Sequence, residues 1–410
     1  QIEQIGEGTY GVVLKCQNKI TGEFVAVKRF KEPADPNDPQ YLKITQREVQ
    51  MLFESKHPFV VKLIEAFKRK TRMYFVFEYC ESTVLDMLGR LSDKEIRLVI
   101  YELLRSLKSL HGRNVVHRDV KPENLLITFQ NSKPVLKLCD FGFARQQNGQ
   151  MTDYVATRWY RSPELLLNSK SYGPPVDIWA VGCLVYEMIT GQPLFPGDSD
   201  FSTLQMIVSL CGHLSPEKMQ MFQRNPKYQG FKLTSKQINF DEYFATRLKD
   251  VQVVKLIKSM LQIEPEARAT VDDLLEDPWF AEVRQEACDY ERQWFAFNKS
   301  EKVEIQEEKP VLEEKTKSRQ GSKSVLAKQK PFQASMQKIA TQTSQQKLQE
   351  IQVKNYQLPT YKERSNSQLM TPQVNKYNHS VFQKAVSVKP KIQIRQADNR
   401  FAGQMTKMWK

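Results

Sequence analysis

Glycines near the start of the chain have the type and spacing to bind phosphate groups. They lie in the run Gly6-Glu7-Gly8-Thr9-Tyr10-Gly11-Val12-Val13. Glycine lets the backbone approach a phosphate closely and offer its N–H groups, so a turn of this kind can hold a nucleotide. An ordinary glycine-rich hairpin is the alternative. A Rossmann unit would need a helix directly after the glycines, and the β-rich residues that follow argue against one.

A lysine on the next apolar strand could bring a positive charge to the same phosphates. It is the last residue of Val25-Ala26-Val27-Lys28. Glu48, 20 residues later on a predicted helix, is the expected ion-pair partner that would fix the ammonium group over the α- and β-phosphates. The alternative is a lysine that faces solvent from an edge strand.

Three further motifs carry carboxylates, an amide and a second lysine. They are His117-Arg118-Asp119-Val120-Lys121-Pro122-Glu123-Asn124, Asp140-Phe141-Gly142 and Ser162-Pro163-Glu164. Taken singly, Asp140 could be a turn aspartate and Asn124 a loop amide. All five motifs in this order form the protein-kinase signature, so residues 1 to about 282 resemble a eukaryotic protein kinase.

The resemblance implies transfer of the γ-phosphoryl group of ATP to a protein hydroxyl, a reaction that depends on positioning and charge stabilisation. Asp119 would accept or orient the hydroxyl proton, and Lys121 would neutralise charge on the γ-phosphoryl group. Asn124 and Asp140 are hard oxygen ligands that suit Mg²⁺. In the family, a lysine two residues after the catalytic aspartate marks serine/threonine kinases, so protein serine and threonine side chains are the expected substrates.

The same resemblance implies an adenine pocket in which the apolar side chains of Ile5, Val13, Ala26 and Leu126 would sandwich the ring. Phe77 would be its gatekeeper, and backbone groups of Glu78 and Cys80 would hydrogen-bond the base. The ATP-binding residues that it implies are Ile5, Gly6, Glu7, Gly8, Thr9, Tyr10, Gly11, Val12, Val13, Ala26, Lys28, Glu48, Phe77, Glu78, Cys80 and Leu126.

The stretches of sequence around these motifs indicate which group of kinases the chain resembles. Thr152-Asp153-Tyr154-Val155-Ala156-Thr157-Arg158-Trp159-Tyr160-Arg161 is similar to the mitogen-activated kinases, whereas Gly6–Val13 is closer to the cyclin-dependent kinases. With Leu138-Cys139-Asp140-Phe141-Gly142-Phe143-Ala144-Arg145 and Tyr172-Gly173-Pro174-Pro175-Val176-Asp177-Ile178-Trp179, the combination resembles the cyclin-dependent-kinase-like family. The run Lys43-Ile44-Thr45-Gln46-Arg47 differs from the cyclin-binding sequence Pro-Ser-Thr-Ala-Ile-Arg, which argues against a cyclin partner.

Phosphorylation of Thr152, with Tyr154, is the activation that this resemblance implies. A phosphate there would carry a charge of about −1.5 to −2 and three strong acceptors. By resemblance, three arginines would converge on it and order the loop. These are Arg47, Arg118 and Arg145. An upstream activating kinase would then be a partner.

Three other charged residues are expected to be structural. Asp177, at the start of a buried helix, would hold the backbone of the catalytic loop. Glu164 and Arg268 would form a buried ion pair that ties the activation segment to the larger lobe. In related kinases, the arginine that matches Arg161 stabilises the backbone that accommodates proline after the phosphorylated residue. The resemblance therefore implies that proline at this position of a substrate is possible.

Hydrophobic periodicity predicts the elements that must position these groups. Residues 1–5, 12–18, 24–30, 60–67 and 73–79 have strand patterns, and residues 44–53, 96–111 and 179–190 have helical ones. We therefore expect an α+β, bilobal kinase fold. Its small β-rich lobe would span residues 1–80, and its large helical lobe would span residues 81–282. The chain begins at Gln1 rather than Met, so a few residues are expected to precede it.

Charge divides the chain of 410 residues in two. Its net charge is +14, but residues 1–300 hold 40 basic and 38 acidic side chains and contribute only +2. Residues 301–410 contribute the other +12. We predict a helical extension over 283–315 and then a disordered basic tail, rich in Gln, Lys and Ser, over 316–410.

The sequence of the tail is compatible with three roles. It could be a solvated linker, a regulatory substrate of the kinase, or a segment that binds an acidic surface such as a microtubule. A kinase-fold scaffold that works through this tail is thus the main rival to an active enzyme. Charge alone, without a fold motif, does not support a nucleic-acid-binding protein.

Composition also bears on where the protein acts. The longest apolar stretch, Ile178–Ile189, is too short to span a membrane, so no membrane partner is expected. Residues 1–30 do not have the charged-then-apolar pattern of a secretory leader, so secretion is not expected. The six cysteines are scattered without metal-ligand spacing. Free thiols in the cytoplasm are the expected state, and the family resemblance implies ciliary, flagellar or cytoskeletal roles.

Overall fold

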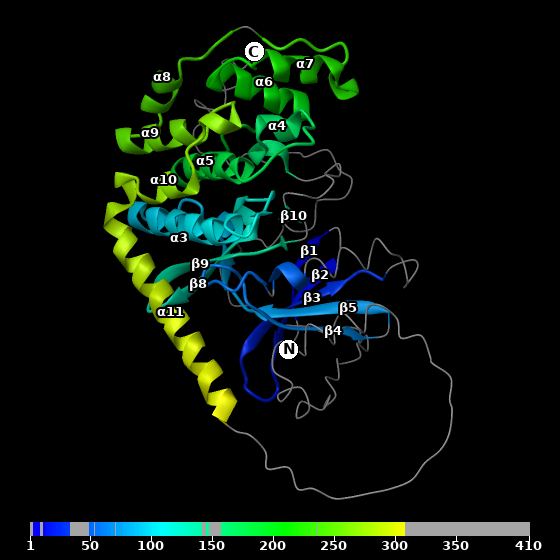
Figure 1. Ribbon diagram of the computed structural model, residues 1–410, viewed down its shortest axis with the longest axis vertical. Helices are drawn as coiled ribbons and strands as arrows, with labels where there is room; N and C mark the ends of the chain where they lie inside the picture. The colour runs from blue at the N-terminus through cyan, green and yellow to red at the C-terminus, as the bar shows by residue number, and fades with distance from the viewer. Residues whose placement is uncertain are drawn as a thin grey trace, which may run out of the picture. The chain divides into compact units, whose positions relative to one another are not determined.

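The computed structural model describes most of the chain before residue 308. The described residues are 3–8, 11–32, 49–52, 54–69, 71–141, 145–146, 157–234 and 236–307. Figure 1 shows a β-sheet at one end of this part and a group of helices at the other. The predicted α+β, bilobal architecture is confirmed.

The first lobe is built on an antiparallel sheet of five strands in the order β1-β2-β3-β5-β4. The strands are β1 (Glu3–Gly8), β2 (Gly11–Gln17), β3 (Phe24–Phe30), β4 (Leu63–Arg69) and β5 (Arg72–Glu78). Alternating β-branched and aromatic residues favour these strands. Lys28 lies opposite Val13 on one side and Phe75 on the other, so it occupies a central strand.

One glycine of the first motif is required by strand packing. A Cβ atom added at Gly11 would lie 2.2 Å from the carbonyl oxygen of Arg29 on the neighbouring strand. Any side chain there would force β2 and β3 apart, so this position needs glycine whether or not a ligand is bound.

The second lobe is organised around α5 (Pro175–Thr190), which is buried from Val176 to Met188. It packs against α3 (Asp93–His111), whose first turn is closed by a capping box between Ser92 and Glu95. Further helices are α2 (Val84–Met87), α4 (Pro163–Leu166), α6 (Asp200–Cys211), α7 (Pro216–Arg224), α8 (Phe240–Ala245), α9 (Val251–Met260) and α10 (Val271–Leu275).

Short strands lie between the two lobes and carry the loops that contain Asp119, Asn124 and Asp140. β6 (Ser82–Thr83), β8 (Leu125–Gln130) and β9 (Lys133–Leu138) form one sheet, and β7 (Val115–Val116) pairs with β10 (Arg145–Gln146). The loop 117–124 therefore runs from the end of β7 to the start of β8, and Asp140 follows β9 directly.

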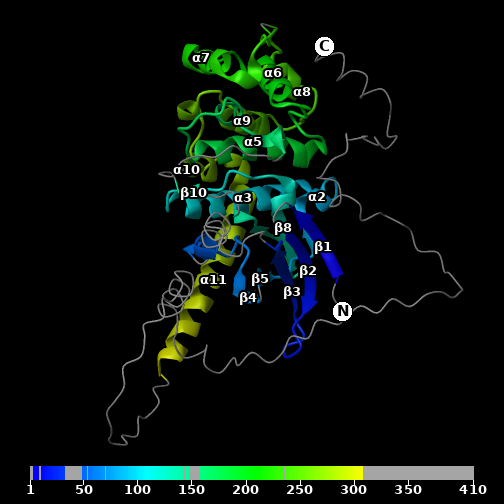
Figure 2. The same ribbon diagram turned by 90° about the vertical axis from the view of Figure 1, so that its right-hand side faces the viewer.

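The helix α11 (Ala281–Glu307) runs from the helical lobe along α3 towards the sheet (Figures 1 and 2). Its Glu291 contacts both lobes, because Oε1 lies 3.2 Å from His57 Nε2 and Oε2 accepts a 2.7 Å bond from Arg105 on α3. The Tyr290 ring also stacks on Phe59, with ring centres 5.6 Å apart. The helix thus fastens the two lobes together. A helical extension was predicted over 283–315, and residues 308–315 of it lie outside the described residues.

We expect Glu291→Gln to lower the free energy of unfolding by roughly 2–3 kcal/mol at neutral pH. Burial alone would raise the pKa of Glu291, but hydrogen bonds from His57 and Arg105 outweigh it and lower the pKa from 4.5 to about 2. Because the folded-state pKa is the lower one, this stabilisation is complete above about pH 4.5 and is lost as the pH falls towards 2.

Urea unfolding from pH 7 down to pH 3 measures this effect. The difference between wild type and Glu291→Gln should shrink with falling pH, while Glu276→Gln, at an exposed pair with Arg284, should show little difference at any pH. A difference in unfolding free energy for Glu291→Gln that stays constant with pH would contradict a stabilising role for the charged Glu291 carboxylate.

Within the part of the chain that the structure describes, no helix combines the length and apolarity needed to cross a membrane.

Candidate active site

Asp119 is held in place by two residues that follow it on the same loop. Its Oδ2 atom accepts hydrogen bonds from Lys121 Nζ at 2.9 Å and from Asn124 Nδ2 at 2.7 Å. Asp119 is 5% exposed. Burial alone would lower the pKa of Lys121, but Asp119, with Glu123 and Asp140 adding, raises it, so the lysine stays charged. Both contacts go to Oδ2, so Oδ1 is the oxygen that would face a proton donor.

The backbone of the loop 117–124 is held by the buried side chain of Asp177. Asp177, 1% exposed, accepts the backbone N–H groups of His117 at 2.9 Å and Arg118 at 2.8 Å and also contacts His111. Burial alone would raise the pKa of Asp177, but its contact with His111 and the other bonds lower it. Arg118 adopts the left-handed backbone region (φ 71°), and the N–H bond to Asp177 helps to hold it there.

The His117 ring connects this loop to the segment that carries Asp140. Its Nε2 lies 3.0 Å from the carbonyl oxygen of Cys139, and its Nδ1 accepts the N–H of Asp119 at 3.3 Å. This pair of contacts requires the neutral tautomer with the proton on Nε2. The ring also packs edge-on against Phe141, with ring centres 5.3 Å apart. Asp119 and Asp140 are thus joined through one buried side chain.

Lys28 and Asp140 bring the sheet and the helical lobe together at the site. Their Nζ and Oδ1 atoms are 3.4 Å apart, and Asp140 has a left-handed backbone (φ 62°). The lysine side chain is 16% exposed, so the charge lies in a partly desolvated position. An ammonium group and a carboxylate placed side by side can hold phosphate oxygens and a cation, respectively.

The apolar residues predicted to enclose adenine are half-buried on four strands. Ile5 lies on β1, Val13 on β2, Ala26 on β3 and Leu126 on β8. Phe77 on β5 is the direct neighbour of Ala26 across the sheet.

The segment that follows β5 presents backbone groups beside this surface. The N–H of Glu78 donates to Lys62 O at 3.1 Å, so an adenine contact from Glu78 would use its carbonyl group. Burial raises the pKa of Cys80 to about 12, so its thiol is uncharged.

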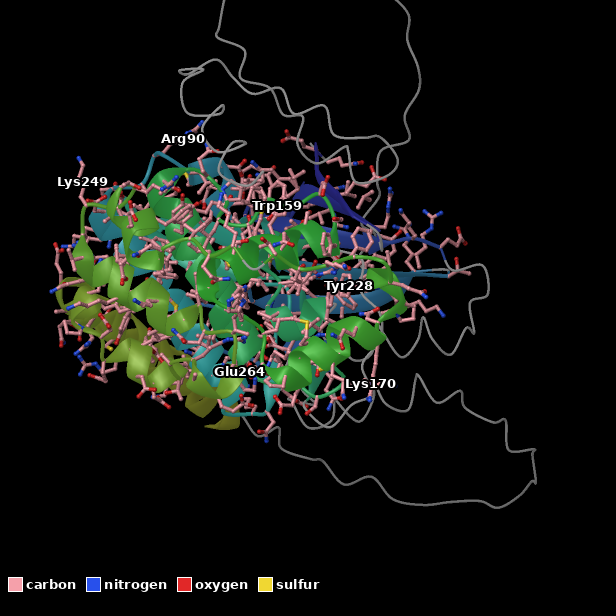
Figure 3. The ribbon with its side chains drawn as sticks, turned by 90° about the horizontal axis from the view of Figure 1, so that it is seen from above. Arg90, Trp159, Lys170, Tyr228, Lys249 and Glu264 are labelled. Carbon is pink, nitrogen blue, oxygen red and sulfur yellow. The ribbon has the colours of Figure 1, made fainter. Side chains whose placement is uncertain are left out.

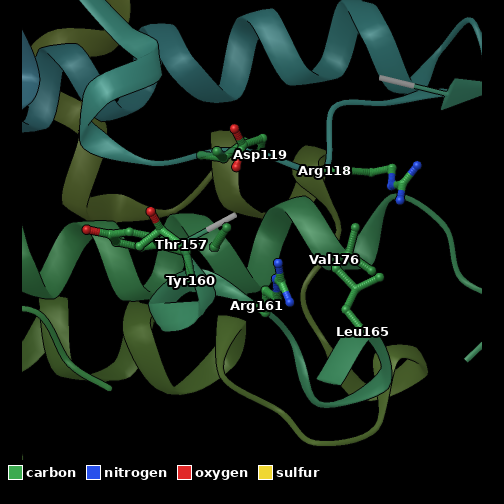
Figure 4. Close-up of a pocket in the computed structure, with 9 residues that line it drawn as sticks. Arg118, Asp119, Thr157, Tyr160, Arg161, Leu165 and Val176 are labelled. Carbon is green, nitrogen blue, oxygen red and sulfur yellow. The ribbon is translucent and has the colours of Figure 1, made fainter. Parts of the chain in front are cut away.

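A cavity lies beside Asp119, between the loop 117–124 and the segment 157–165. Figure 4 shows Arg118 and Asp119 on one side of it and Thr157, Tyr160 and Arg161 on the other. Arg161 pairs with Asp200 at the start of α6, 3.6 Å away. The cavity has a volume of about 10 Å³, room for about one water molecule, so it borders Asp119 without itself holding a polypeptide.

The same segment is anchored to the helical lobe, which Figure 3 shows from above. Trp159 donates to Gly197 O at 3.0 Å, and Tyr228 donates to Leu166 O at 2.7 Å. Glu164 and Arg268 form a bidentate pair, with N–O distances of 2.7 and 2.8 Å. These contacts fix the floor of the cavity.

Several predicted site residues are beyond what the structure describes. They are Thr9, Tyr10, Arg47, Glu48, Thr152 and Tyr154. Of Gly8 and Arg145 only the backbone is described. The phosphothreonine cluster and the Lys28–Glu48 pair therefore stay predictions. Arg118, the described member of that cluster, lies over the Tyr172 ring at 5.3 Å.

Asn124 and Asp140 fit a magnesium ion that is also held by substrate phosphates. Asn124 Nδ2 donates twice to Asp119, so the amide oxygen Oδ1 is the atom that would ligate a metal ion. Asp140 adds a carboxylate. Among the described residues there is no group of three or more His, Cys, Asp or Glu side chains that could hold a metal unaided. Mg²⁺ typically takes one or two protein ligands together with phosphates, which matches this donor set.

Comparisons with known proteins point in the same direction. The protein kinase domain family matches residues 1–280. Cyclin-dependent kinase-like 4 of Mus musculus is 44% identical over 294 residues, 70% of this chain and 84% of the relative. The Homo sapiens protein of that name is 44% identical over 288 residues, 68% and 74% of the two chains. Cyclin-dependent kinase-like 2 of Rattus norvegicus is 43% identical over 286 residues, 67% and 55% of the two chains.

Proposed function

The chain belongs to the cyclin-dependent-kinase-like family of protein serine/threonine kinases, and we propose that phosphorylation of its activation segment switches on phosphoryl transfer from Mg-ATP to protein substrates. The predicted family is confirmed by the comparisons. The observation that best supports the chemistry is the Asp119 carboxylate, which Lys121 and Asn124 orient on the side that faces the segment 157–165.

Each site residue has a role that follows from its position. Asp119 Oδ1 accepts or orients the proton of the substrate hydroxyl, which points the oxygen at the γ-phosphoryl group. Lys121, charged and 2.9 Å from Asp119, neutralises charge on that group. Lys28 holds the α- and β-phosphates. Asn124 and Asp140 would hold Mg²⁺, which supplies positive charge to the ATP phosphates.

A positional peptide library tests the substrate class. Incubation of the purified chain with Mg-ATP should phosphorylate peptides with serine or threonine as acceptor and leave tyrosine peptides unmodified. The same library shows whether a proline after the acceptor is favoured, which is the role that the resemblance gives to Arg161.

We expect Thr152→Ala to lower kinase activity, with Tyr154→Phe lowering it further. A phosphate at Thr152 would offer strong acceptors to Arg118, Arg47 and Arg145 and order the segment around the cavity. The measurement is the initial rate of the chain after phosphorylation sites have been mapped by mass spectrometry. Equal rates for wild type phosphorylated at Thr152 and for Thr152→Ala would contradict activation by this site.

The basic tail supports a second role, delivery of the kinase to an acidic surface such as a microtubule. Residues 301–410 carry a net charge of +12, and binding by counterion release would weaken steeply with salt. We expect the full chain to co-sediment with microtubules at low salt and a chain ending at residue 300 to stay in solution. Identical pelleting of the two chains would rule this role out. A cytoplasmic or ciliary location is proposed from the family resemblance, and a tail that binds microtubules would fit it.

A further inference from the structure

An open groove lies where α11 passes α3 and the hairpin of β8 and β9 (Figure 1). Its volume is about 540 Å³, within the range of sites that hold a ligand or several side chains of a peptide. None of the residues assigned above to the active site lines it. The groove is therefore a separate surface with the size of a binding site.

Apolar and aromatic side chains line much of this groove. Leu98 on α3 and Val135 on β9 are buried, and α11 contributes Tyr290, Trp294 and Phe297. The Phe297 side chain is 64% exposed although it borders an apolar groove. Exposed aromatic residues next to a concave apolar surface are typical of a place where another polypeptide segment binds.

The charged residues that line the groove are mainly acidic. Glu286 and Asp289 come from α11, and Lys133 on β9 donates to Glu286 at 2.6 Å. A third acid, Glu102 on α3, is only 2% exposed, and burial raises its pKa to about 8 against the opposing effect of its bond from the Leu136 N–H. A cation brought close would favour the charged form of Glu102. The groove thus suits a segment that is apolar on one side and basic on the other.

One stretch of the basic tail, residues 385–395, has this character. It reads Ala-Val-Ser-Val-Lys-Pro-Lys-Ile-Gln-Ile-Arg and contains no acidic residue. Its apolar residues all stand at even positions and its basic residues at odd positions: Val386, Val388, Pro390, Ile392 and Ile394 against Lys389, Lys391 and Arg395. Because alternate side chains of an extended chain share a face, the pattern predicts one apolar face and one basic face.

The chain that joins the groove to this segment is long enough for the two to meet. From Trp294 to the end of α11 at Glu307 the helix rises by about 20 Å. Residues 308–384 follow, and when extended they would span up to about 250 Å. Binding within one molecule also gains from the effective concentration that the connection supplies.

We propose that the groove between α11, α3 and the β8–β9 hairpin binds residues 385–395 of the same chain. The apolar face of the segment lies on the aromatic residues of α11, and its basic face lies along the acidic residues. Docking there keeps the tail on the helix that fastens the two lobes together. The inference concerns binding alone, so it does not depend on the proposed kinase function.

Crosslinking of the full chain with an amine-reactive reagent tests the contact. The Lys133 side chain at the groove is 64% exposed, and the segment carries Lys389 and Lys391. Mass spectrometry should find Lys133 linked to one or both of them. When unlabelled and ¹⁵N-labelled chains are mixed, the linked peptides should carry the same isotope. Links mainly between different isotopes would show that a second copy fills the groove and would overturn the proposal.

Substitutions assign the link to the groove and to the apolar face. The double change Ile392→Asp and Ile394→Asp should lower the yield of the link by roughly tenfold or more, the cost of failing to bury such a side chain. Phe297→Lys should have a similar effect. Phe231→Lys is the matched control, because Phe231 is 50% exposed and does not line the groove, and it should keep the wild-type yield. Wild-type yield in both test variants would overturn the assignment.

A fluorescent peptide with the sequence of residues 382–397 gives an independent readout. The full chain with Ile392→Asp and Ile394→Asp should bind it roughly tenfold more tightly than wild type, whose own segment competes for the groove. A peptide of the same composition, with apolar residues at both odd and even positions, should bind weakly. Equal affinity of wild type and the double variant for the native peptide would show that the tail does not fill the groove. Absence of binding to the double variant would overturn the proposal as well.

Discussion

Arg268→Ala is expected to lower the free energy of unfolding by about 3–5 kcal/mol, because it leaves Glu164 buried with an uncompensated charge. The side chains of Arg268 and Glu164 are only 0% and 5% exposed. They join two segments 104 residues apart, the one that lines the cavity and the one that follows α9. Water cannot replace the lost partner at this depth.

Arg268 also serves backbone groups that would lose their donors. It donates to the carbonyl oxygens of Gln262 at 2.7 Å, Pro175 at 2.9 Å and Ile263 at 3.3 Å. Its guanidinium also lies 5.1 Å from the centre of the Trp179 ring. The substitution therefore removes a charge pair, three carbonyl contacts and a packing contact together. Loss of stability, rather than a change at the reacting atoms, is the primary effect.

Chemical denaturation of the full chain measures the loss. Arg292→Ala is a matched control, because Arg292 pairs with Asp289 at the surface with side chains 69% and 45% exposed. That control should change stability by less than about 1 kcal/mol. An Arg268→Ala chain with the wild-type unfolding midpoint would show that the pair is not structural.

Asp119→Asn is expected to lower the phosphorylation rate by roughly 10²- to 10⁴-fold, the usual cost of losing a general base. Asparagine keeps the size of the side chain but cannot take a proton at Oδ1. The loop should keep its position, because Asp177 and His117 hold its backbone independently of the Asp119 carboxylate. The substitution thus separates the chemistry from the fold.

The rate is measured as phosphopeptide formed per minute at saturating ATP. Asp241→Asn is the control, since Asp241 is 68% exposed at a surface pair with Lys258 and should leave the rate unchanged. Equal nucleotide binding by wild type and Asp119→Asn would show an intact site. A rate loss below about tenfold would contradict a proton-accepting role for Asp119.

Sequence patterns predicted the two lobes, but they did not reveal the structural reason for every motif residue. The glycine motif suggested phosphate approach, whereas the structure shows that Gly11 is needed because β3 passes 2.2 Å from where its Cβ would lie. Lys28 had two readings, an edge-strand lysine and a phosphate ligand. Its strand is central, and its charge pairs with Asp140, which lies 112 residues away along the chain. Such pairings depend on sheet order, which local periodicity does not encode.

Two tertiary interactions of glutamate side chains could not be predicted from the sequence. Glu291 looks like one of many acidic residues on a polar helix, yet it contacts His57, 234 residues earlier. Glu123 was part of a quoted motif, but its charge also raises the pKa of Glu187 on α5, an effect that only the tertiary fold creates. Charged residues that act through tertiary contacts cannot be told from surface charges until the fold brings them together.

The most direct test of the central claim follows the γ-phosphoryl group itself. The purified chain is incubated with Mg²⁺ and ATP labelled at the γ-phosphate, together with a mixture of serine, threonine and tyrosine peptides, and the labelled amino acids are identified after hydrolysis. Label should appear in phosphoserine and phosphothreonine with wild type and be almost absent with Asp119→Asn. No transfer by wild type, equal transfer by Asp119→Asn, or label confined to phosphotyrosine would contradict a serine/threonine kinase with Asp119 at its centre.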